Sequence, residues 1–363
     1  MRILMVTARF LPSVGGVEMH VAEVARRVAQ RGHQVTVLSA DRSPELQADE
    51  HRDGFELQRV RAWPRSGDAF FAPAIWRRIT RGRWDVVHIQ SFQTLVAPIA
   101  MAAARSAAIP YVVTFHAGGH SSRIRTSLRG VQLAVLRPLL ARADRLVALT
   151  DSEIADYSRR LRLPRDRFVL IPNGADLPAP RGPRPEREGG GPLIASIGRL
   201  ERYKGHQHVI GALPGILRER PDTHLWIAGS GPYRDTLAAL ATHLGVASRT
   251  EIRAIPPEQR SRMADELARV DVAVLASEFE TQPIALLEAA SLGCRLVVAD
   301  SPGLRELGDR GLAHVVSHPG DSAELARAVL AEMDEPRATR AVGLPTWDEC
   351  ADRLCAVYES LAG

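Results

Sequence analysis

Short apolar segments rich in β-branched residues alternate with longer amphipathic segments along almost the whole chain. In one amphipathic segment Val17, Val21, Val24 and Val28 share a helical face, and Gly32 stands where a helix would end. This alternation is typical of a parallel sheet covered by helices on both faces. In the first half we expect strands at residues 3–6, 35–38, 86–89, 111–114, 146–149 and 168–171.

Residues 178–192, rich in Pro, Gly and Arg, interrupt the pattern and indicate a linker or loop tip. The alternation then restarts, with strands expected at 193–197, 225–228, 272–275 and 296–298. The fold class is therefore α/β, with two Rossmann-like, doubly wound domains. Such sheets bind ligands at the carboxyl ends of their strands, and two domains can direct those ends into one cleft.

The composition, with 45% hydrophobic and 25% charged residues among 363, is that of a globular protein. The longest apolar run, 95–104, contains Pro98 and is shorter than the about 20 residues of a membrane-spanning helix. The first residues indicate a strand rather than a signal peptide, so we expect a cytoplasmic protein. The cysteines form no metal or disulfide pattern, and Cys350 and Cys355 are expected on a terminal helix.

The basic residues are strongly biased toward arginine. The formal net charge is +5, and of 47 basic residues only Lys204 is a lysine, which leaves 46 arginines. A compact ammonium packed against phosphate is a task that a guanidinium does not perform equally well. Chance retention is the alternative explanation for Lys204.

Two segments are candidates for binding phosphate. Gly15 and Gly16 follow the first strand and open a helix, where backbone N–H groups and the helix dipole favour an anion. The dinucleotide fingerprint Gly-x-Gly-x-x-Gly is absent there, which disfavours a nicotinamide enzyme, and a plain tight turn is the alternative. In the second half Arg199 and Lys204 flank a loop before a helix and could hold a diphosphate; a solvated loop is the alternative.

Two glutamates follow the strand expected at 272–275. Glu280 would lie in the loop above that strand, and Pro283 suits the first turn of the next helix. Glu288 is the one charge within the apolar stretch 284–292, so its carboxylate needs a partner. A ribose diol would satisfy it; an arginine, or a side chain that reaches solvent, would do so too.

Histidine and acidic clusters give weaker signals. His116 follows the strand 111–114 at its functional end, whereas His88 within 86–89 is expected to be structural. No Asp-x-Asp pair occurs, so the usual carboxylates for a divalent ion beside a nucleotide sugar are missing. The Asp49-Glu50-His51-Asp53 cluster resembles a metal site in composition alone, and we interpret it as a solvated turn.

In order and spacing, the chain resembles the retaining GT-B glycosyltransferases of family 4 over nearly its whole length. The resemblance rests on Gly15-Gly16-Val17-Glu18, Thr114-Phe115-His116, Ile171-Pro172-Asn173-Gly174-Ala175-Asp176, Gly198-Arg199-Leu200 with Lys204-Gly205, Gly229-Ser230-Gly231-Pro232, Glu280 to Glu288 with Ala289-Ala290-Ser291-Leu292-Gly293, and Trp347 and Tyr358 of a C-terminal helix. It implies the GT-B fold, with an acceptor-binding domain at 1–175 completed by a helix at 346–363, and a donor-binding domain at 176–345.

The resemblance also implies roles for individual residues. Arg199 and Lys204 would bind the donor diphosphate and replace a metal ion, so that neither metal nor cofactor is expected. Glu288 would bind the ribose, and His116 would lie near the reaction centre. The transferred sugar would be held by Glu280, Thr281, Gln282 and the amides near Pro283, and the donor would further contact Gly15, Gly16, Gly229 and Gly231.

The chain departs from the family pattern at three places. Gln282-Pro283 stands where Phe-Gly is frequent, Ser301-Pro302-Gly303 where Gly-Gly is frequent, and Arg253-Ala254-Ile255 where Phe-Leu-Gly usually precedes the base-contacting loop. The expected activity is transfer of a hexose from a UDP- or GDP-linked donor to a hydroxyl acceptor, with retention. The base, sugar, acceptor and oligomeric state stay undetermined. A nucleotide-sugar epimerase and a binding protein without turnover are the rival interpretations.

The first half contains two basic stretches. One joins Arg77, Arg78, Arg81 and Arg83 to Trp76 and Trp84; the other holds Arg123, Arg125, Arg129, Arg137 and Arg142, with no acid between 121 and 143. Three interpretations stand: peripheral contact with an anionic membrane at its inner face, contact with an anionic acceptor, or plain solvated faces. No nucleic-acid-binding module is recognisable.

Overall fold

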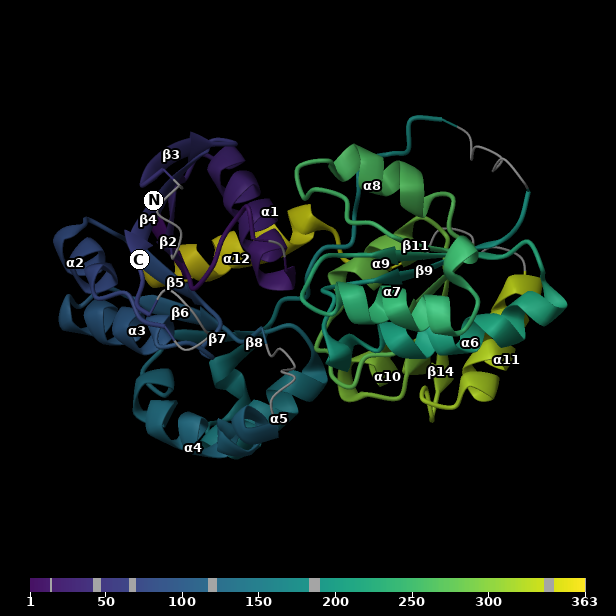
Figure 1. The fold of residues 1–363 in the computed structure, drawn as a ribbon. Coiled ribbons are helices and arrows are strands. Elements are labelled where there is room, and N and C mark those ends of the chain that lie inside the picture. Colours follow the sequence, from purple (N-terminus) through teal and green to yellow (C-terminus); the bar gives the residue numbers. More distant parts are fainter. Residues whose placement is uncertain are drawn as a thin grey trace. The chain divides into compact units, whose positions relative to one another are not determined.

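A computed structural model describes residues 1–13, 15–41, 47–64, 70–116, 123–182, 190–335 and 343–362, with side chains in the helix from residue 123 described from residue 130 onward. The chain forms two compact units, each with its own sheet (Figure 1). The first comprises Met1–Ala117, Ser122–Gly174 and Pro345–Gly363, and the second is formed by Ala175–Leu344. The boundary at Gly174 precedes the proline-rich stretch, of which residues 183–189 lie outside the described part.

The first unit is built on an eight-stranded sheet of order β3-β4-β2-β1-β5-β6-β7-β8. All neighbouring pairs are parallel except β3 and β4, which form an antiparallel hairpin. The strands are β1 Arg2–Thr7, β2 Gln34–Asp41, β3 Asp49–Arg52, β4 Phe55–Arg61, β5 Val86–Gln90, β6 Tyr111–Thr114, β7 Arg145–Ala148 and β8 Phe168–Leu170.

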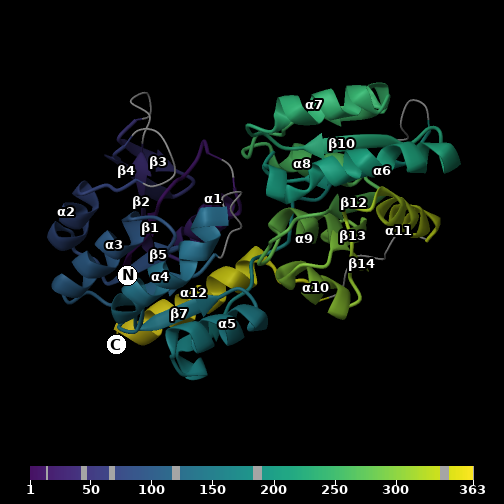
Figure 2. The same cartoon turned by 60° about the horizontal axis from the view of Figure 1, so that its bottom comes forward.

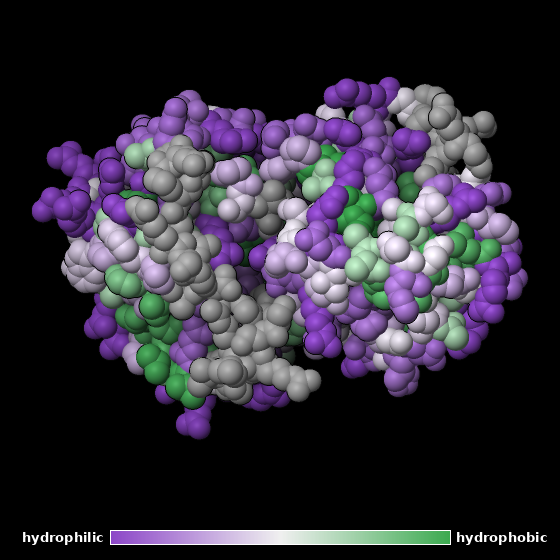
Figure 3. All heavy atoms as spheres, viewed as in Figure 1, coloured by the Kyte–Doolittle hydropathy of each residue, from purple (hydrophilic) through white to green (hydrophobic). Residues whose placement is uncertain are grey.

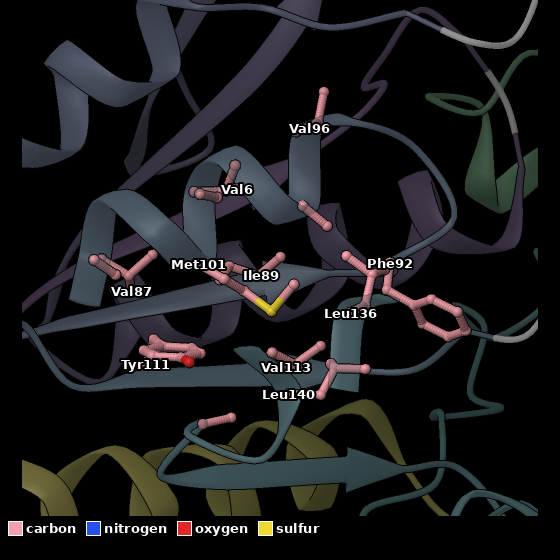
Figure 4. Packing of buried hydrophobic residues seen from close by; sticks show 14 of the residues in the cluster. Val6, Val87, Ile89, Phe92, Val96, Met101, Tyr111, Val113, Leu136 and Leu140 are labelled. Atoms are coloured by element: carbon pink, nitrogen blue, oxygen red, sulfur yellow. The ribbon is translucent and has the colours of Figure 1, made fainter. Parts of the chain in front are cut away.

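One face of this sheet is covered by α2, α3, α4 and α5. Their apolar side chains join those of the strands in one core, in which Met101 of α3 lies among Ile89, Val113 and Leu140 (Figure 4). Burial of such side chains is the main force that holds helices to a sheet. The bounds are α2 Ala74–Arg81, α3 Val96–Ser106, α4 Arg123–Leu140, α5 Asp151–Leu161 and the short 3-10 helix η1 Arg165–Arg167.

The opposite face carries α1 (Gly16–Gln30) and the C-terminal helix α12 (Trp347–Ala362), which contact each other. Gly32 follows α1 with φ +87°, which confirms the expected glycine at the helix end. Trp347 is buried against Gly174, where an added Cβ would lie 2.3 Å from the Trp347 backbone nitrogen. Cys350 and Cys355 are buried on α12, as expected, and this helix is drawn in yellow in Figure 2.

The second unit has a six-stranded parallel sheet of order β11-β10-β9-β12-β13-β14. Alternate strand residues enter two separate cores, one shared with α8, α9 and α10 and the other with α6, α7 and α11. The elements are β9 Leu193–Ile197, η2 Arg202–Lys204, α6 His206–Glu219, β10 His224–Ala228, α7 Arg234–His243, η3 Ala247–Arg249, β11 Thr250–Ile252, α8 Arg260–Leu267, β12 Val272–Leu275, α9 Ile284–Ser291, β13 Arg295–Ala299, α10 Pro302–Asp309, β14 His314–Val316 and α11 Ser322–Asp334.

The acidic cluster after residue 48 differs from its prediction. Asp49, Glu50 and His51 lie in the edge strand β3, and the turn is confined to Asp53 and Gly54, both with positive φ. Glu50 forms an ion pair with Arg59 of β4. Within the described ranges no group of His, Cys, Asp and Glu is arranged to hold a metal ion, and no helix is long and apolar enough to cross a membrane.

Candidate functional site

The loop that carries Arg199 leaves the carboxyl end of β9 and is braced by glycines. A Cβ on Gly229 would lie 1.9 Å from the Gly198 carbonyl oxygen, and one on Gly231 2.5 Å from that of Leu200. The Leu200 N–H donates to the Ser230 carbonyl at 2.9 Å. The contacts of Gly229 and Gly231 in this structure are therefore with the Arg199 loop, whose path they allow.

His206, the first residue of α6, also holds this loop and was not anticipated from the sequence. It is fully buried, its Nδ1 lies 2.8 Å from the Ser196 hydroxyl, and its Nε2 lies 3.2 Å from the Arg199 carbonyl oxygen. Burial lowers the pKa of His206 to about 4, against the effect of the hydrogen bond to the Arg199 carbonyl. A neutral ring that donates from Nε2 and accepts at Nδ1 satisfies both contacts and keeps positive charge away from Arg199.

Lys204 lies on the turn η2, which ends at Gly205 with φ +76°. A Cβ on Gly205 would lie 1.9 Å from the Ala276 carbonyl oxygen, so glycine is required for the turn to pack against the end of β12. There the Lys204 ammonium meets Glu280, with Nζ 2.5 Å from Oε1 and side chains 16% and 11% exposed. Burial opposes the charged form, but Glu280 outweighs it and the pKa of Lys204 is raised.

The segment between β12 and α9 carries Glu280, Thr281 and Gln282. The Ser277 hydroxyl donates a hydrogen bond to the Phe279 carbonyl at 3.0 Å and so holds the start of this segment. Gly303 packs closely against it, because a Cβ there would lie 2.3 Å from the carbonyl oxygens of residues 280 and 281. Pro283 is not in the first turn, as expected from the sequence, but is the N-cap of α9, with ψ 97°.

Glu288 is 3% exposed in α9 and forms an ion pair with Arg260, the first residue of α8. An arginine was one of the partners that the sequence allowed for Glu288. Which arginine it is could not be predicted, because Arg260 lies 28 positions earlier in a separate helix. Separating a buried carboxylate from its guanidinium partner is costly, so ribose binding by Glu288 would require exchange with Arg260.

The cations of this unit's candidate site are each matched by a carboxylate. Besides the Lys204–Glu280 and Arg260–Glu288 pairs, an Arg199 nitrogen lies 2.8 Å from Glu201 Oε1. Arg199 is the most accessible of these groups, with 48% of its side chain exposed. A diphosphate would compete with the carboxylates for these cations, and Arg199 is the most readily recruited because exposed ion pairs are weak.

In the first unit the helix α1 begins at Gly16, with Gly15 as its N-cap in an extended conformation. A Cβ on Gly15 would lie 2.4 Å from the Glu18 carboxylate, so the glycine lets that side chain fold back over the helix start. Val14, which precedes them, lies outside the described residues. The helix start follows the carboxyl end of β1, the edge at which α/β sheets bind ligands.

His116 lies at the same edge, after β6, and is 7% exposed. Its Nε2 lies 2.8 Å from the Gln90 Oε1, and its ring packs edge-to-face on His20 with centroids 4.6 Å apart. Burial, reinforced by His20 and His88, lowers the pKa of His116 well below its ordinary value. An oxygen acceptor at Nε2 places the proton there, so Nδ1 of this neutral ring is the acceptor.

His20 was missed in the sequence although it lies in the apolar stripe of α1. It is 1% exposed, and its Nδ1 lies 2.7 Å from the Asn173 side-chain oxygen. Burial lowers its pKa to about 4. The structural role expected for His88 is confirmed: it is fully buried, with Nδ1 2.6 Å from the Tyr358 hydroxyl and Nε2 2.7 Å from the Thr114 hydroxyl.

Two groups of predicted residues are thus assembled. The second unit brings Arg199, Lys204 and Glu280 to the carboxyl ends of β9 and β12, with Glu288 on the helix that follows. The first unit connects the helix that begins at Gly16 to His116 through His20. Arg123, Arg125 and Arg129 of the second basic stretch have side chains outside the described part.

Both units match models of known protein families. The model described as Glycosyltransferase Family 4 matches residues 14–178, and Glycosyl transferases group 1 matches residues 183–342. A glycogen synthase of Mycobacterium tuberculosis (strain H37Rv) is 32% identical over 94% of this chain and 88% of its own length. A phosphatidyl-myo-inositol mannosyltransferase of Mycobacterium leprae is 29% identical over 100% of this chain and 97% of its own.

Solved structures agree on the fold. Anabaena HepE, in complex with UDP and glucose, superposes with a TM-score of 0.78 at 18% identity and covers 99% of both chains. WaaG, a glycosyltransferase of lipopolysaccharide biosynthesis, superposes with a TM-score of 0.72 at 20% identity over 99% of this chain and 98% of its own.

Proposed function

The chain belongs to the GT-B glycosyltransferases of family 4, and from this premise we propose that it moves a hexose from a nucleoside-diphosphate sugar to a hydroxyl acceptor, with retention of anomeric configuration. The observation that carries the proposal is the buried Lys204–Glu280 pair at the end of β12, beside the Arg199 loop. The UDP and glucose named for HepE support a nucleotide-linked donor.

In this proposal Arg199 and Lys204 bind the diphosphate. As the bond between sugar and phosphate breaks, negative charge grows on the departing oxygen, and positioned cations lower the barrier by stabilising it. Arg199 exchanges Glu201 for phosphate, while Lys204 stays anchored by Glu280 and is oriented before the donor arrives. With no Asp-x-Asp pair in the sequence, these cations take the place of a divalent ion.

Glu280, Thr281, Gln282 and the N–H groups at the start of α9 hold the transferred sugar. The helix N-terminus offers donors to sugar hydroxyls, and Glu280 offers an acceptor while it fixes Lys204. Glu288 accepts from the ribose hydroxyls, which requires that Arg260 yield or share one carboxylate oxygen. Gly15 and Gly16, at the start of α1, stay proposed donor-binding residues.

His116 serves the reaction as a neutral ring. Its Nδ1 accepts a hydrogen bond from a substrate hydroxyl, while Nε2 donates to Gln90. Since its pKa is held low by burial, it does not add positive charge beside the sugar. The acceptor's proton passes to the departing phosphate, and the acceptor itself is bound by the first unit.

Nucleotide release from a panel of labelled donors tests this function. We expect release from one UDP- or GDP-linked sugar that persists in EDTA, together with a raised melting temperature in the matching nucleotide. Interconversion of donor sugars without nucleotide release would favour an epimerase. Stabilisation without any turnover would leave a binding protein.

A further inference from the structure

The outer surface of the first unit is divided into faces of opposite character. We propose that the face formed by α2, α3, α4 and the segment before α2 docks on an anionic lipid bilayer; this docking face is distinct from the donor site. The docking proposed here does not depend on which sugar the protein transfers. The helices α2 and α3 contact each other, as do α3 and α4, so they form one continuous layer along a side of the unit (Figure 1).

The first observation is where exposed apolar side chains lie. Six large hydrophobic residues of the described chain are exposed. Five belong to this face, Phe71 40%, Trp76 41%, Leu95 51%, Val131 61% and Val135 70%, and Trp63 42% adjoins it through its backbone hydrogen bonds with Phe71. On α4, Val131 and Val135 stand one turn apart, opposite the buried Leu133 and Leu136. Hydrophobic residues at the surface over α4 are visible in Figure 3.

The second observation is charge. The described residues of this layer, 70–84, 91–107 and 130–143, contain seven arginines and no aspartate or glutamate. Within the described chain none of the seven forms an ion pair with a carboxylate. The seven are Arg77, Arg78, Arg81, Arg83, Arg105, Arg137 and Arg142, all exposed.

The opposite face shows that this is not a property of the whole surface. Helices α1 and α12 together carry six acids and three arginines, and Arg31, just after α1, pairs with Asp348 and Asp352 of α12. A surface that merely needs to be soluble mixes both signs in this way. A face whose arginines have no carboxylate partner, beside exposed tryptophans, matches the headgroup region of an anionic bilayer, where both residue types are favoured.

A cavity at one end of the docking face could take a headgroup. It has a volume of about 470 Å³ and is lined by Arg2, Arg77, Arg78 and Arg81, with Trp84 on its wall. Glu56 is the acid among the described lining residues, so the cavity keeps a positive excess. The three guanidinium groups of α2, together with that of Arg2, can donate hydrogen bonds to phosphate oxygens.

Docking would place the bilayer near the acceptor edge of the sheet. Trp63 follows the carboxyl end of β4, and Leu95 follows that of β5, while His116 follows β6. Because these strands are parallel, their carboxyl ends lie at one edge. A hydroxyl carried by a lipid would therefore meet the same edge that presents His116.

Co-sedimentation with vesicles tests the proposal. We expect the full chain to bind phosphatidylglycerol-containing vesicles and not pure phosphatidylcholine vesicles. Each basic residue contributes about fivefold near such a surface, so Arg77→Gln/Arg78→Gln/Arg81→Gln should weaken partitioning about a hundredfold. The matched control removes three exposed arginines of the second unit, Arg218→Gln/Arg310→Gln/Arg327→Gln, and should bind nearly as wild type.

A second variant separates a bilayer from other polyanions. Trp76→Ser with Val131→Ser and Val135→Ser should weaken vesicle binding at least tenfold but leave heparin binding unchanged, because heparin offers no apolar layer. Equal binding to neutral vesicles, an equal loss in the control variant, or apolar substitutions without effect would overturn the proposal. Nucleotide release by every variant should match wild type, so failure here is distinguishable from failure of the proposed function.

Discussion

Replacing Lys204 by methionine removes the ammonium and keeps the unbranched stem. In the structure Nζ lies 2.5 Å from Glu280 Oε1, and both side chains are largely buried. The proposed role requires a charge that acts mainly as the diphosphate departs. The variant therefore tests whether this pair serves the reaction or only the fold.

The expected magnitudes differ for turnover and binding. Removing one preorganised group that stabilises transition-state charge costs about 3–4 kcal/mol, or about a hundred- to a thousandfold in kcat. Donor affinity should fall about tenfold or less, because Arg199 still meets the diphosphate in the ground state. The fold should also suffer, since Glu280 is left buried without its partner, a loss of about 3 kcal/mol in the free energy of unfolding.

Single-turnover nucleotide release, donor titration calorimetry and urea unfolding measure the three quantities separately. Lys204→Met with Glu280→Gln should recover much of the lost stability but none of the turnover. The control Arg202→Met changes an exposed cation of the same turn and should leave all three near wild type. Wild-type kcat in Lys204→Met, or turnover that returns with stability in the double variant, would refute the reasoning.

Three further predictions concern other parts of the two units. Glu288→Gln should weaken donor binding about ten- to a hundredfold by calorimetry, through loss of a charge-assisted hydrogen bond; unchanged affinity would exclude the ribose role. Gly205→Ala should lower the melting temperature by several degrees, because its Cβ would overlap the Ala276 carbonyl and φ is +76°; a variant as stable as wild type would contradict the packing. The pKa values of His20 and His88 are lowered by burial to about 4 and about 3, below the unfolded value, so their stabilising effect is complete above about pH 6.5 and is lost as pH falls toward 4. Urea unfolding should show this loss, with a shallower slope for His20→Gln; a flat profile would mean that these rings are not buried neutral.

Much of the fold follows from the sequence because buried parallel strands are continuous apolar runs. The strand expected at 111–114 is β6, and that expected at 272–275 is β12, each with the predicted bounds. The strand β4 was not predicted because its residues alternate between apolar and polar, as in a strand with one covered face. The three-residue edge strands β11 and β14 contain polar residues, so they form no apolar run like that of the equally short β8, which was predicted.

The candidate site was predictable in its residues and less so in their partners. Glycines and charges after strands pointed to Arg199, Lys204 and Glu280, since carboxyl ends of parallel strands converge. The Arg260–Glu288 pair depends on how two helices pack, which no local spacing reveals. His20 did leave a signal, because a histidine within the apolar stripe of α1 must find a buried polar partner, here Asn173.

The anomeric configuration of the first-formed product tests the central claim most directly. Once the donor is known from nucleotide release, proton NMR during early turnover reports the anomeric coupling of the released or transferred sugar before mutarotation. A retaining transfer supported by Arg199 and Lys204 predicts an α-linked donor that yields an α product, and the same result in EDTA. A β product from that donor would contradict the proposed reaction while leaving the GT-B fold in place.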